Sequence, residues 1–385
     1  MTSNHYSLIP NPLLISMEPV THFLTGACLA RSGFNRKTAL ATVTMTLAAE
    51  APDIDWAAYA KGSVTGFACH RGATHTIWGI PLVAALVIAV VFTVYRFWPR
   101  KRPHSSPNAA DAKAADPAAR PRWGLLYLFA CIAGYSHLLL DFTNSYGLRP
   151  LWPWWPKWYS WDIVFIVEPL LLLFLIAGLT LPALFALINR EIGARSRGPR
   201  GRLGAIVALV LMAALWAVRD YEHRRAVYAI EALEYHGRVP VRVSAFPYMV
   251  NPFAWYGLVD TGDSYTAMYV DSLAPAVDPQ GRARVYRKPE PTPASRAADD
   301  TRLGQVYLNW AQYPLVETER LGGNEPGYLV RFRDLRFMYP DSRRTALSAY
   351  VLLSPALQAE DAGFGRAASL ATGFQAGSPV GGEER

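Results

Sequence analysis

The chain has 385 residues, of which 51% are hydrophobic and 18% are charged, a balance that favours a protein embedded in a lipid bilayer. Its mean hydropathy of +0.10 is too low for a chain that lies in the membrane throughout, so we expect a water-soluble part as well. The formal net charge of +8 does not indicate a nucleic-acid partner, because Lys and Arg fall in short runs between apolar segments. Cytoplasmic loops that meet anionic lipid explain that placement better.

Six apolar segments along the chain predict helices within the membrane. They are 19–32, 38–51, 76–95, 124–142, 163–188 and 203–218. The last four approach the roughly 20 residues that span a hydrocarbon core. The first two are short and rich in Ala and Thr, and we expect them to form a helical hairpin packed inside the bundle, where small residues permit close contact.

Basic residues between these segments predict how the chain threads the membrane. The loops 96–123 and 189–202 are rich in Arg and Lys, which places them in the cytoplasm by the positive-inside rule. The basic turn between the two short segments fits the same side through Arg31, Arg36 and Lys37. The parts expected outside are the N-terminus, 52–75, 143–162 and the chain after 219.

Residues 221–236 have a helical apolar spacing and could continue the last predicted helix. After them come short runs rich in Val, Tyr and Phe, separated by Gly, Pro and Asp, which is typical of a small β-rich domain. The predicted fold is therefore an α-helical integral membrane bundle of about six helices with a small C-terminal β-rich (α+β) soluble domain. The predicted parts are an N-terminal tail 1–16, a transmembrane helical domain 17–220 with a disordered cytoplasmic linker 103–121, a β-rich exported domain 221–359 and a flexible tail 360–385.

An unusual set of metal-ligand side chains lies near the outer ends of the predicted helices. The set comprises His22, Asp53, Asp55, His70, His75, His137, Asp141 and Asp162. Positions i and i+4 share one helix face, so His137 and Asp141 can point at one ion. An imidazole and a carboxylate at that spacing suit Zn²⁺, with Mn²⁺ as the alternative. The paired carboxylates of Asp53 and Asp55 would repel each other unless a cation lay between them.

The placement of these groups on one face is the strongest argument that they act together. The predicted membrane topology depends only on Arg and Lys, yet it places every one of these His and Asp residues outside. Taken singly, a His on an apolar helix is more often a core residue, and Asp53 or Asp55 could simply cap a helix. Arg71 has two interpretations, an interfacial anchor or a clamp for an anionic substrate. The Trp-rich stretch 148–161 is most simply an aromatic belt at the outer interface.

At these residues the sequence resembles the membrane-bound metal-dependent hydrolases of the YdjM type. The matching motifs, in order, are PVTHFLTG, PDID, HRGATHT, SHLLLDFTNSYGLRPLWP and WDIVFIVEP, and they cover about 17–190. The C-terminal run NPFAWYGLVDTGDSY also looks like the tail of longer members. Two positions depart from the pattern: Glu168 stands where Asp is expected in the fifth motif, and Glu50 precedes PDID where a neutral residue is usual. The resemblance implies a bacterial inner-membrane enzyme that uses a divalent metal for hydrolysis.

The sequence therefore predicts a metal-dependent hydrolase that acts at the periplasmic face of the inner membrane. Seven or more ligand-type groups are too many for one tetrahedral zinc, which favours several ions and a phosphoester substrate, and a site at the interface favours a lipid-linked substrate. Asp55 or Asp162 is the expected general base, and Arg71 is expected to stabilise developing negative charge. Expected partners are membrane lipid and a small-molecule or lipid-linked substrate, whereas the oligomeric state stays open.

Two other classes of function fit the same pattern. A metal-binding membrane transporter or sensor would use these residues without hydrolysis, but a transporter needs ligands near the bilayer midplane. A structural membrane protein whose β-rich part binds a partner would tolerate Ala at His70, His75 or Asp141.

Overall fold

The computed structural model describes residues 19–97, 120–191 and 201–365, apart from 236, 275, 323–325, 340–346 and the side chains of 186–191. The chain divides into two compact units, with the boundary between Arg287 and Lys288. The predicted N-terminal tail and nearly all of the predicted linker and C-terminal tail lie outside the described residues. The few described residues of the predicted C-terminal tail belong largely to strand β9 (Ala359–Phe364).

Each of the six predicted apolar segments contains a helix. The helices are α1 (Pro19–Arg31), α2 (Ala41–Glu50), α4 (Gly79–Phe97), α5 (Trp123–Thr143), α6 (Pro169–Glu191) and α7 (Arg202–Glu231). Among the described residues, only α4, α5 and α7 are long and apolar enough to cross a membrane, and the apolar part of α6, Pro169–Phe185, is shorter. With 13 and 10 residues, α1 and α2 extend for roughly 20 and 15 Å, well short of a bilayer core. Six membrane-spanning helices are therefore not confirmed.

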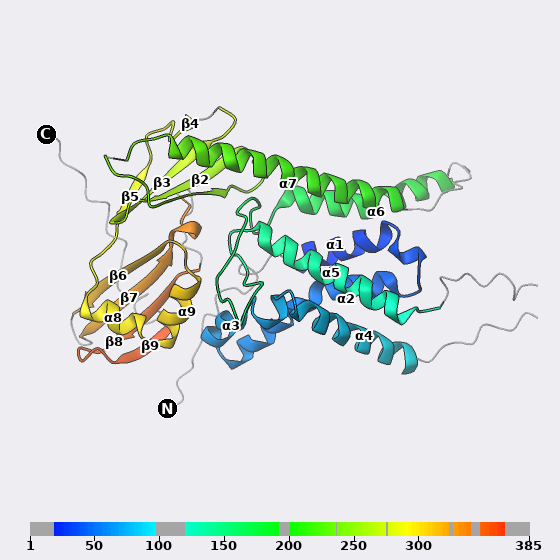
Figure 1. Cartoon of the computed structure of the whole chain (residues 1–385), viewed down its shortest axis with the longest axis horizontal. Coiled ribbons are helices and arrows are strands. Elements are labelled where there is room, and N and C mark those ends of the chain that lie inside the picture. Colours follow the sequence, from blue (N-terminus) through cyan, green and yellow to red (C-terminus); the bar gives the residue numbers. More distant parts are fainter. Residues whose placement is uncertain are drawn as a thin grey trace, which may run out of the picture. The chain divides into compact units, whose positions relative to one another are not determined.

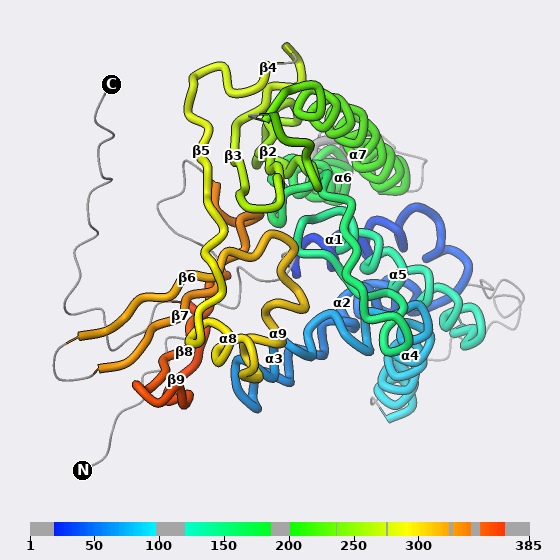
Figure 2. The backbone as a smooth tube through the Cα atoms, turned by 60° about the vertical axis from the view of Figure 1, so that its left-hand side comes forward, coloured from blue at the N-terminus to red at the C-terminus, as the bar shows by residue number. Residues whose placement is uncertain are grey.

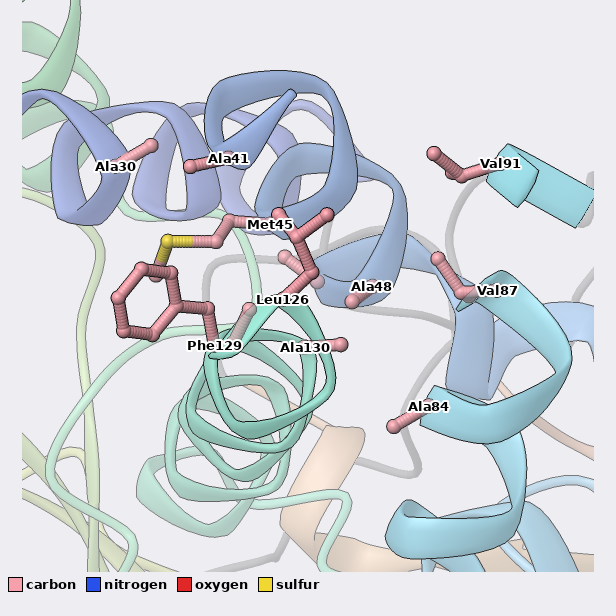
Figure 3. Close-up of a cluster of buried hydrophobic side chains, with 12 residues drawn as sticks. Ala30, Ala41, Met45, Ala48, Ala84, Val87, Val91, Leu126, Phe129 and Ala130 are labelled. Carbon is pink, nitrogen blue, oxygen red and sulfur yellow. The ribbon is translucent and has the colours of Figure 1, made fainter. Parts of the chain in front are cut away.

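The two short helices pack as the predicted hairpin against α4 and α5. A Cβ atom on Gly26 of α1 would lie 2.7 Å from Ala49 Cβ and 2.8 Å from Met45 O of α2, so only glycine allows this approach. Figure 3 shows the apolar core that joins the four helices. Its labelled side chains are Ala30, Ala41, Met45, Ala48, Ala84, Val87, Val91, Leu126, Phe129 and Ala130. Small residues bring the backbones together, and the larger ones fill the remaining space.

The α7 helix extends beyond the apolar helices and packs against a sheet, as Figure 1 shows. That sheet is antiparallel, in the order β1 (Arg242–Pro247), β2 (Ala254–Asp260), β3 (Ser264–Asp271) and β4 (Ala276–Val277), and β5 (Arg284–Arg287) also pairs with β3. A Cβ on Gly257 would lie 2.7 Å from Ile230 Cδ1, so α7 lies directly on β2. The helix therefore continues 11 residues beyond the predicted domain boundary at 220.

The second unit holds another antiparallel sheet, in the order β6 (Pro314–Leu321), β7 (Gly327–Asp334), β8 (Ala349–Leu353) and β9. Two short helices, α8 (Pro293–Asp299) and α9 (Arg302–Trp310), pack against it (Figure 2). Tyr307, Trp310 and Phe332 are fully buried here. The β-rich character of the C-terminal region is therefore confirmed, and its two sheets belong to different compact units.

Candidate metal centre

The predicted ligands gather at one end of the helices in the first unit. His22 lies in the first turn of α1, whereas His137 and Asp141 lie in the last two turns of α5. Asp53 and Asp55 lie in the 3-10 helix η3 (Ala51–Lys61), which follows α2 directly. His70 follows α3 (Ser63–Cys69), and His75 closes the 3-10 turn η4 (Ala73–His75) just before α4. Arg31 and Arg96 lie at the opposite ends of α1 and α4, as the threading argument requires.

His137 is fixed by a hydrogen bond to the backbone. Its Nδ1 lies 2.7 Å from Ala49 O, and a carbonyl oxygen can only accept, so Nδ1 carries the proton. The lone pair is then on Nε2, which faces the cluster. A metal-binding histidine is held in this way by its other nitrogen.

His75 is held in the same manner from the opposite side. Its Nδ1 lies 3.2 Å from Asp55 Oδ2 and 3.0 Å from Thr74 Oγ1. Its Nε2 lies 3.0 Å from His137 Nε2, and both rings are fully buried. Two imidazole nitrogens whose lone pairs point at each other repel unless a proton or a cation lies between them.

Two carboxylate oxygens complete this arrangement. Asp141 Oδ2 lies 3.5 Å from His75 Nε2 and 3.4 Å from His137 Nε2. Asp53 Oδ1 lies 3.3 and 3.7 Å from the same two nitrogens. The four atoms thus form two triangles that share the edge between the nitrogens. A tetrahedral zinc with ligand distances of about 2.0–2.1 Å has ligand–ligand edges of about 3.3 Å. The edges of each triangle, 3.0–3.7 Å, are close to this value, so the two nitrogens and either carboxylate oxygen could supply three ligands of a Zn²⁺.

The charges of the cluster respond to one another. Burial raises the pKa of the Asp53 carboxyl, but the nearby His137 and His75 outweigh burial and lower it to about 2. Burial likewise lowers the pKa of His75, but hydrogen bonds to Asp53 and Asp55 raise it to about 9. Without a metal, a proton on His75 thus supplies the positive charge that the carboxylates require.

Asp55 contacts four neighbouring residues, one of which is His75. Its Oδ1 lies 3.2 Å from His70 Nδ1, and its Oδ2 accepts from Arg71 N at 2.8 Å and from Thr74 Oγ1 at 3.2 Å. Burial raises the pKa of Asp55, but the hydrogen bonds to His70 and His75 overcome burial and hold it well below its usual range. This carboxylate therefore orients two histidine rings.

Arg71 holds Asp141 in place. Its backbone has a positive φ of 51°, and its guanidinium, fully buried, donates to Asp141 Oδ1 at 2.6 Å and to Gly147 O at 2.8 Å. It also lies 3.3 Å from Asn144 Oδ1. These contacts favour a positioning role, because Asp141 Oδ2 stays directed at the two histidines. The predicted role of Arg71 as an anion clamp stays a prediction.

Two further histidines extend the cluster on either side. The His22 ring stacks on His137 with centroids 3.8 Å apart, and its Nε2 lies 3.6 Å from Asp141 Oδ1. Neither ring nitrogen of His22 nor Nε2 of His70 has a hydrogen-bond partner within the described parts of the chain, although all are buried. Ligand atoms of His22, His137 and Asp141 lie within 4.8 Å of one another, and so do those of Asp53, Asp55 and His70. Together with the central four atoms, these groups offer ligand atoms for more than one ion.

The family to which this chain belongs follows from its sequence. The model of the YdjM inner membrane protein family matches residues 17–226, more than half of the chain. The chain belongs to that family. No curated protein matches the chain, and no solved structure matches it. The predicted YdjM resemblance is therefore confirmed, and the three apolar helices agree with the inner membrane that the family name gives.

Within the YdjM match, two acidic residues, Asp162 and Glu168, behave differently from the cluster. Asp162 has a positive φ of 59° and is absent from the three groups of close ligand atoms in the described structure. Glu168 is buried and pairs with Arg219 of α7 at 2.6 Å, so its carboxylate ties α7 to the start of α6. The roles predicted for Asp162 are not tested by this geometry.

Glu50, which was not among the predicted ligands, lies half-buried at the end of α2. Its Oε1 is buried and has no hydrogen-bond partner among the described residues. Burial raises its pKa to about 7, against the opposing charge of His137. The signal in the sequence was its position three residues before Asp53.

Proposed function

We propose that this YdjM-family protein is a metal-dependent hydrolase, anchored in the inner membrane by several helices, that acts at the periplasmic face on a phosphoester or lipid-linked substrate. The observation that carries the proposal is the pair of buried Nε2 atoms of His75 and His137, 3.0 Å apart, with a carboxylate oxygen on either side. Such a set brings lone pairs and negative charges together in a protein core, which is unfavourable unless a proton or a cation lies between them.

The residues that would hold the metal are His75, His137, Asp53 and Asp141, with His22 beside them. A bound Zn²⁺ or Mn²⁺ would polarise a phosphoryl or carbonyl oxygen and make water acidic enough to react near neutral pH. The chain itself keeps the donors in place through Ala49 O, Asp55 and Arg71. Such supporting contacts are worth about 10–100-fold in metal affinity.

Proton transfer needs a group whose pKa lies near the working pH. Glu50, with a pKa of about 7 and a buried unpartnered oxygen, meets that requirement best among the acids described. Asp55 is the weaker candidate, because both of its oxygens already accept hydrogen bonds. Asp162, the other candidate from the sequence, stays a prediction.

The periplasmic location is supported by charge. The cluster lies at the helix ends opposite Arg31, Arg96, Arg122 and Arg202, which the positive-inside rule assigns to the cytoplasm. Ligands at one edge of the membrane suit an enzyme at the interface, whereas a transporter would hold its ion near the midplane.

The test is metal content together with turnover. Detergent-purified protein is stripped with a chelator, reloaded with Zn²⁺ or Mn²⁺, analysed for bound metal and assayed on phosphatidic acid and on a soluble aryl phosphate. We compare wild type, a His137→Ala/Asp141→Ala double variant, Glu50→Gln, and His223→Ala as a histidine outside the cluster. Wild type and His223→Ala should hold at least one ion per chain and turn over substrate. The double variant should hold none, and Glu50→Gln should bind metal but turn over about 100-fold more slowly.

Two outcomes would contradict the proposal in different ways. A folded wild type that takes up no metal removes the metal centre altogether. Metal bound with stoichiometry but without turnover of any phosphoester or lipid-linked substrate would favour a metal sensor or transporter instead.

A further inference from the structure

A cavity of about 480 Å³ lies beside the metal centre, between η3, α3, η4 and the turn Arg149–Trp152. Asp55 and Thr74, which support the histidines, line it together with Lys61, Arg149 and Trp152. Most of its other wall residues are Ala, Gly or Ile. The cavity thus joins an apolar wall to two cations next to the cluster.

Arg149 differs from the other buried arginines in lacking a carboxylate partner. Arg71, Arg219 and Arg336 each have a carboxylate oxygen 2.6–2.8 Å from the guanidinium. Arg149 is only 8% exposed, yet within the described ranges no carboxylate lies within 4.0 Å of its side chain.

The contacts of Arg149 are to neutral groups. Its Nη2 donates to Ala68 O at 2.9 Å and lies 3.3 Å from His70 O, and the guanidinium stacks over Trp158 at 4.5 Å. Its Nε is buried without a hydrogen-bond partner among the described residues. Buried charges in proteins are normally paired, so a counter-ion for Arg149 is expected from outside the chain.

The cavity wall carries two positively charged side chains and one carboxylate, so an anion would meet little electrostatic repulsion there. Lys61 is exposed and lines the same cavity. Asp55 is the one acid on its wall, and that carboxylate already accepts hydrogen bonds from Arg71 N and Thr74. The planar guanidinium of Arg matches phosphate oxygens, whereas Lys supplies a point charge.

The surroundings of the cavity suit a lipid. Ile54, on its wall, is 55% exposed, and the nearby Trp154 and Trp155 are 75% and 56% exposed. Large apolar side chains exposed beside a cationic cavity fit the headgroup region of a bilayer, where Trp is enriched.

We propose that this cavity is a subsite for the phosphate group of an amphiphilic substrate, held by Arg149 and Lys61 next to Asp55. Arg149, rather than Arg71, is then the anion-binding arginine of the site. The inference rests on the proposed hydrolase for the fate of the bound phosphate, but the binding itself does not require the metal.

The subsite is tested on chelator-treated, metal-free protein in detergent, by calorimetric titration with dihexanoyl phosphatidic acid and, separately, with inorganic phosphate. The variants are Arg149→Gln, Arg149→Lys and Lys61→Ala, and Lys157→Ala is the control, an exposed lysine outside the cavity wall. Binding should weaken at least about ten-fold in Arg149→Gln and about three-fold in Lys61→Ala. Arg149→Lys should fall between wild type and Arg149→Gln, and Lys157→Ala should match wild type.

Cys69 gives a second readout on the unaltered chain, because its thiol is exposed and lines the cavity. Bound phosphatidic acid should slow maleimide modification of Cys69, followed by mass spectrometry. Tighter binding of the lipid than of phosphate identifies a lipid substrate, and equal binding identifies a soluble phosphate. If neither ligand binds the folded protein, or if Lys61→Ala behaves as Lys157→Ala and Cys69 is not protected, the subsite is overturned, even where metal uptake and hydrolysis persist.

Discussion

Two clusters of buried charge, one at the ends of the membrane helices and one in the unit that begins at Lys288, are built on opposite principles. In the second unit, Asp334 and Arg336 satisfy each other fully. Asp334 Oδ2 accepts from Arg336 Nε at 2.9 Å and from Gln312 N at 2.8 Å, and Oδ1 accepts from Arg336 N at 3.0 Å. Arg336 also donates to Trp310 O and lies over the Trp310 ring.

In the metal-centre cluster, several buried polar atoms lack hydrogen-bond partners among the described residues. The nitrogens of His22, Oδ2 of Asp53 and Nε2 of His70 are buried without hydrogen-bond partners in the described structure. The Nε2 atoms of His75 and His137 face each other. Burial of charge alone therefore does not identify a functional site, because Asp334 and Arg336 are just as buried. What distinguishes the site is donors whose outer nitrogens are fixed while their inner lone pairs converge.

Breaking the satisfied pair should produce the largest change in stability. Asp334→Ala leaves the Arg336 guanidinium buried without its carboxylate, which costs about 3–5 kcal/mol. Hydrogen exchange should then show loss of protection in β7 and β8 of the full-length protein, whereas bound metal stays at the wild-type level. Loss of metal in this variant would show that the two clusters are not independent.

Changing a supporting carboxylate of the metal centre should mainly reduce the affinity for metal. Asp55→Asn keeps the size of the side chain, but its amide can donate to His75 Nδ1 and so shift the proton of that ring onto Nε2. We expect about 10–100-fold weaker metal affinity, measured by competition with a chelator. The loss of stability should be about 1–3 kcal/mol, smaller than in Asp334→Ala, because the Arg71 N–H loses its acceptor.

The matched control for that variant is Asp263→Asn, which removes an exposed carboxylate paired with Arg238. It should leave metal affinity unchanged. Equal affinity in Asp55→Asn and Asp263→Asn would mean that Asp55 does not set the tautomer of His75.

The helices could be predicted from the sequence because apolar runs of given length are a local signal. The start of α6 was misplaced for a physical reason. The run 163–168 is apolar, but Ile163 and Val164 donate their backbone N–H groups to Thr143 O instead of to a helix turn. The continuation of the last predicted helix beyond 220 was foreseeable from the helical apolar spacing of 221–236, whereas its packing on a sheet depends on tertiary contacts.

The candidate ligands were also predictable, because positive-inside topology put them on one face. Their individual roles were not. Ala49 O supports His137 across 88 residues of sequence, and Arg71 reaches Asp141 across 70. Contacts over such distances, one of them from a residue with positive φ, leave no local pattern in the sequence.

The last test concerns pH, and it distinguishes the two clusters without any substitution. The pKa of His75 in the metal-free protein is raised to about 9, so the ring is protonated at neutral pH, and the proton must leave before Nε2 can bind a metal. Asp53, with a pKa of about 2, is ionised throughout this range and contributes no pH dependence. Metal affinity should therefore rise about ten-fold per pH unit from pH 6 toward 9, for one displaced proton, and then level off. Chelator competition at pH 6, 7, 8 and 9 measures the slope, and proton release on metal addition to weakly buffered protein checks it independently. A flat profile would show that no proton is exchanged, which would remove His75 from the metal site, whereas hydrogen exchange around Asp334 should not respond to metal at any of these pH values.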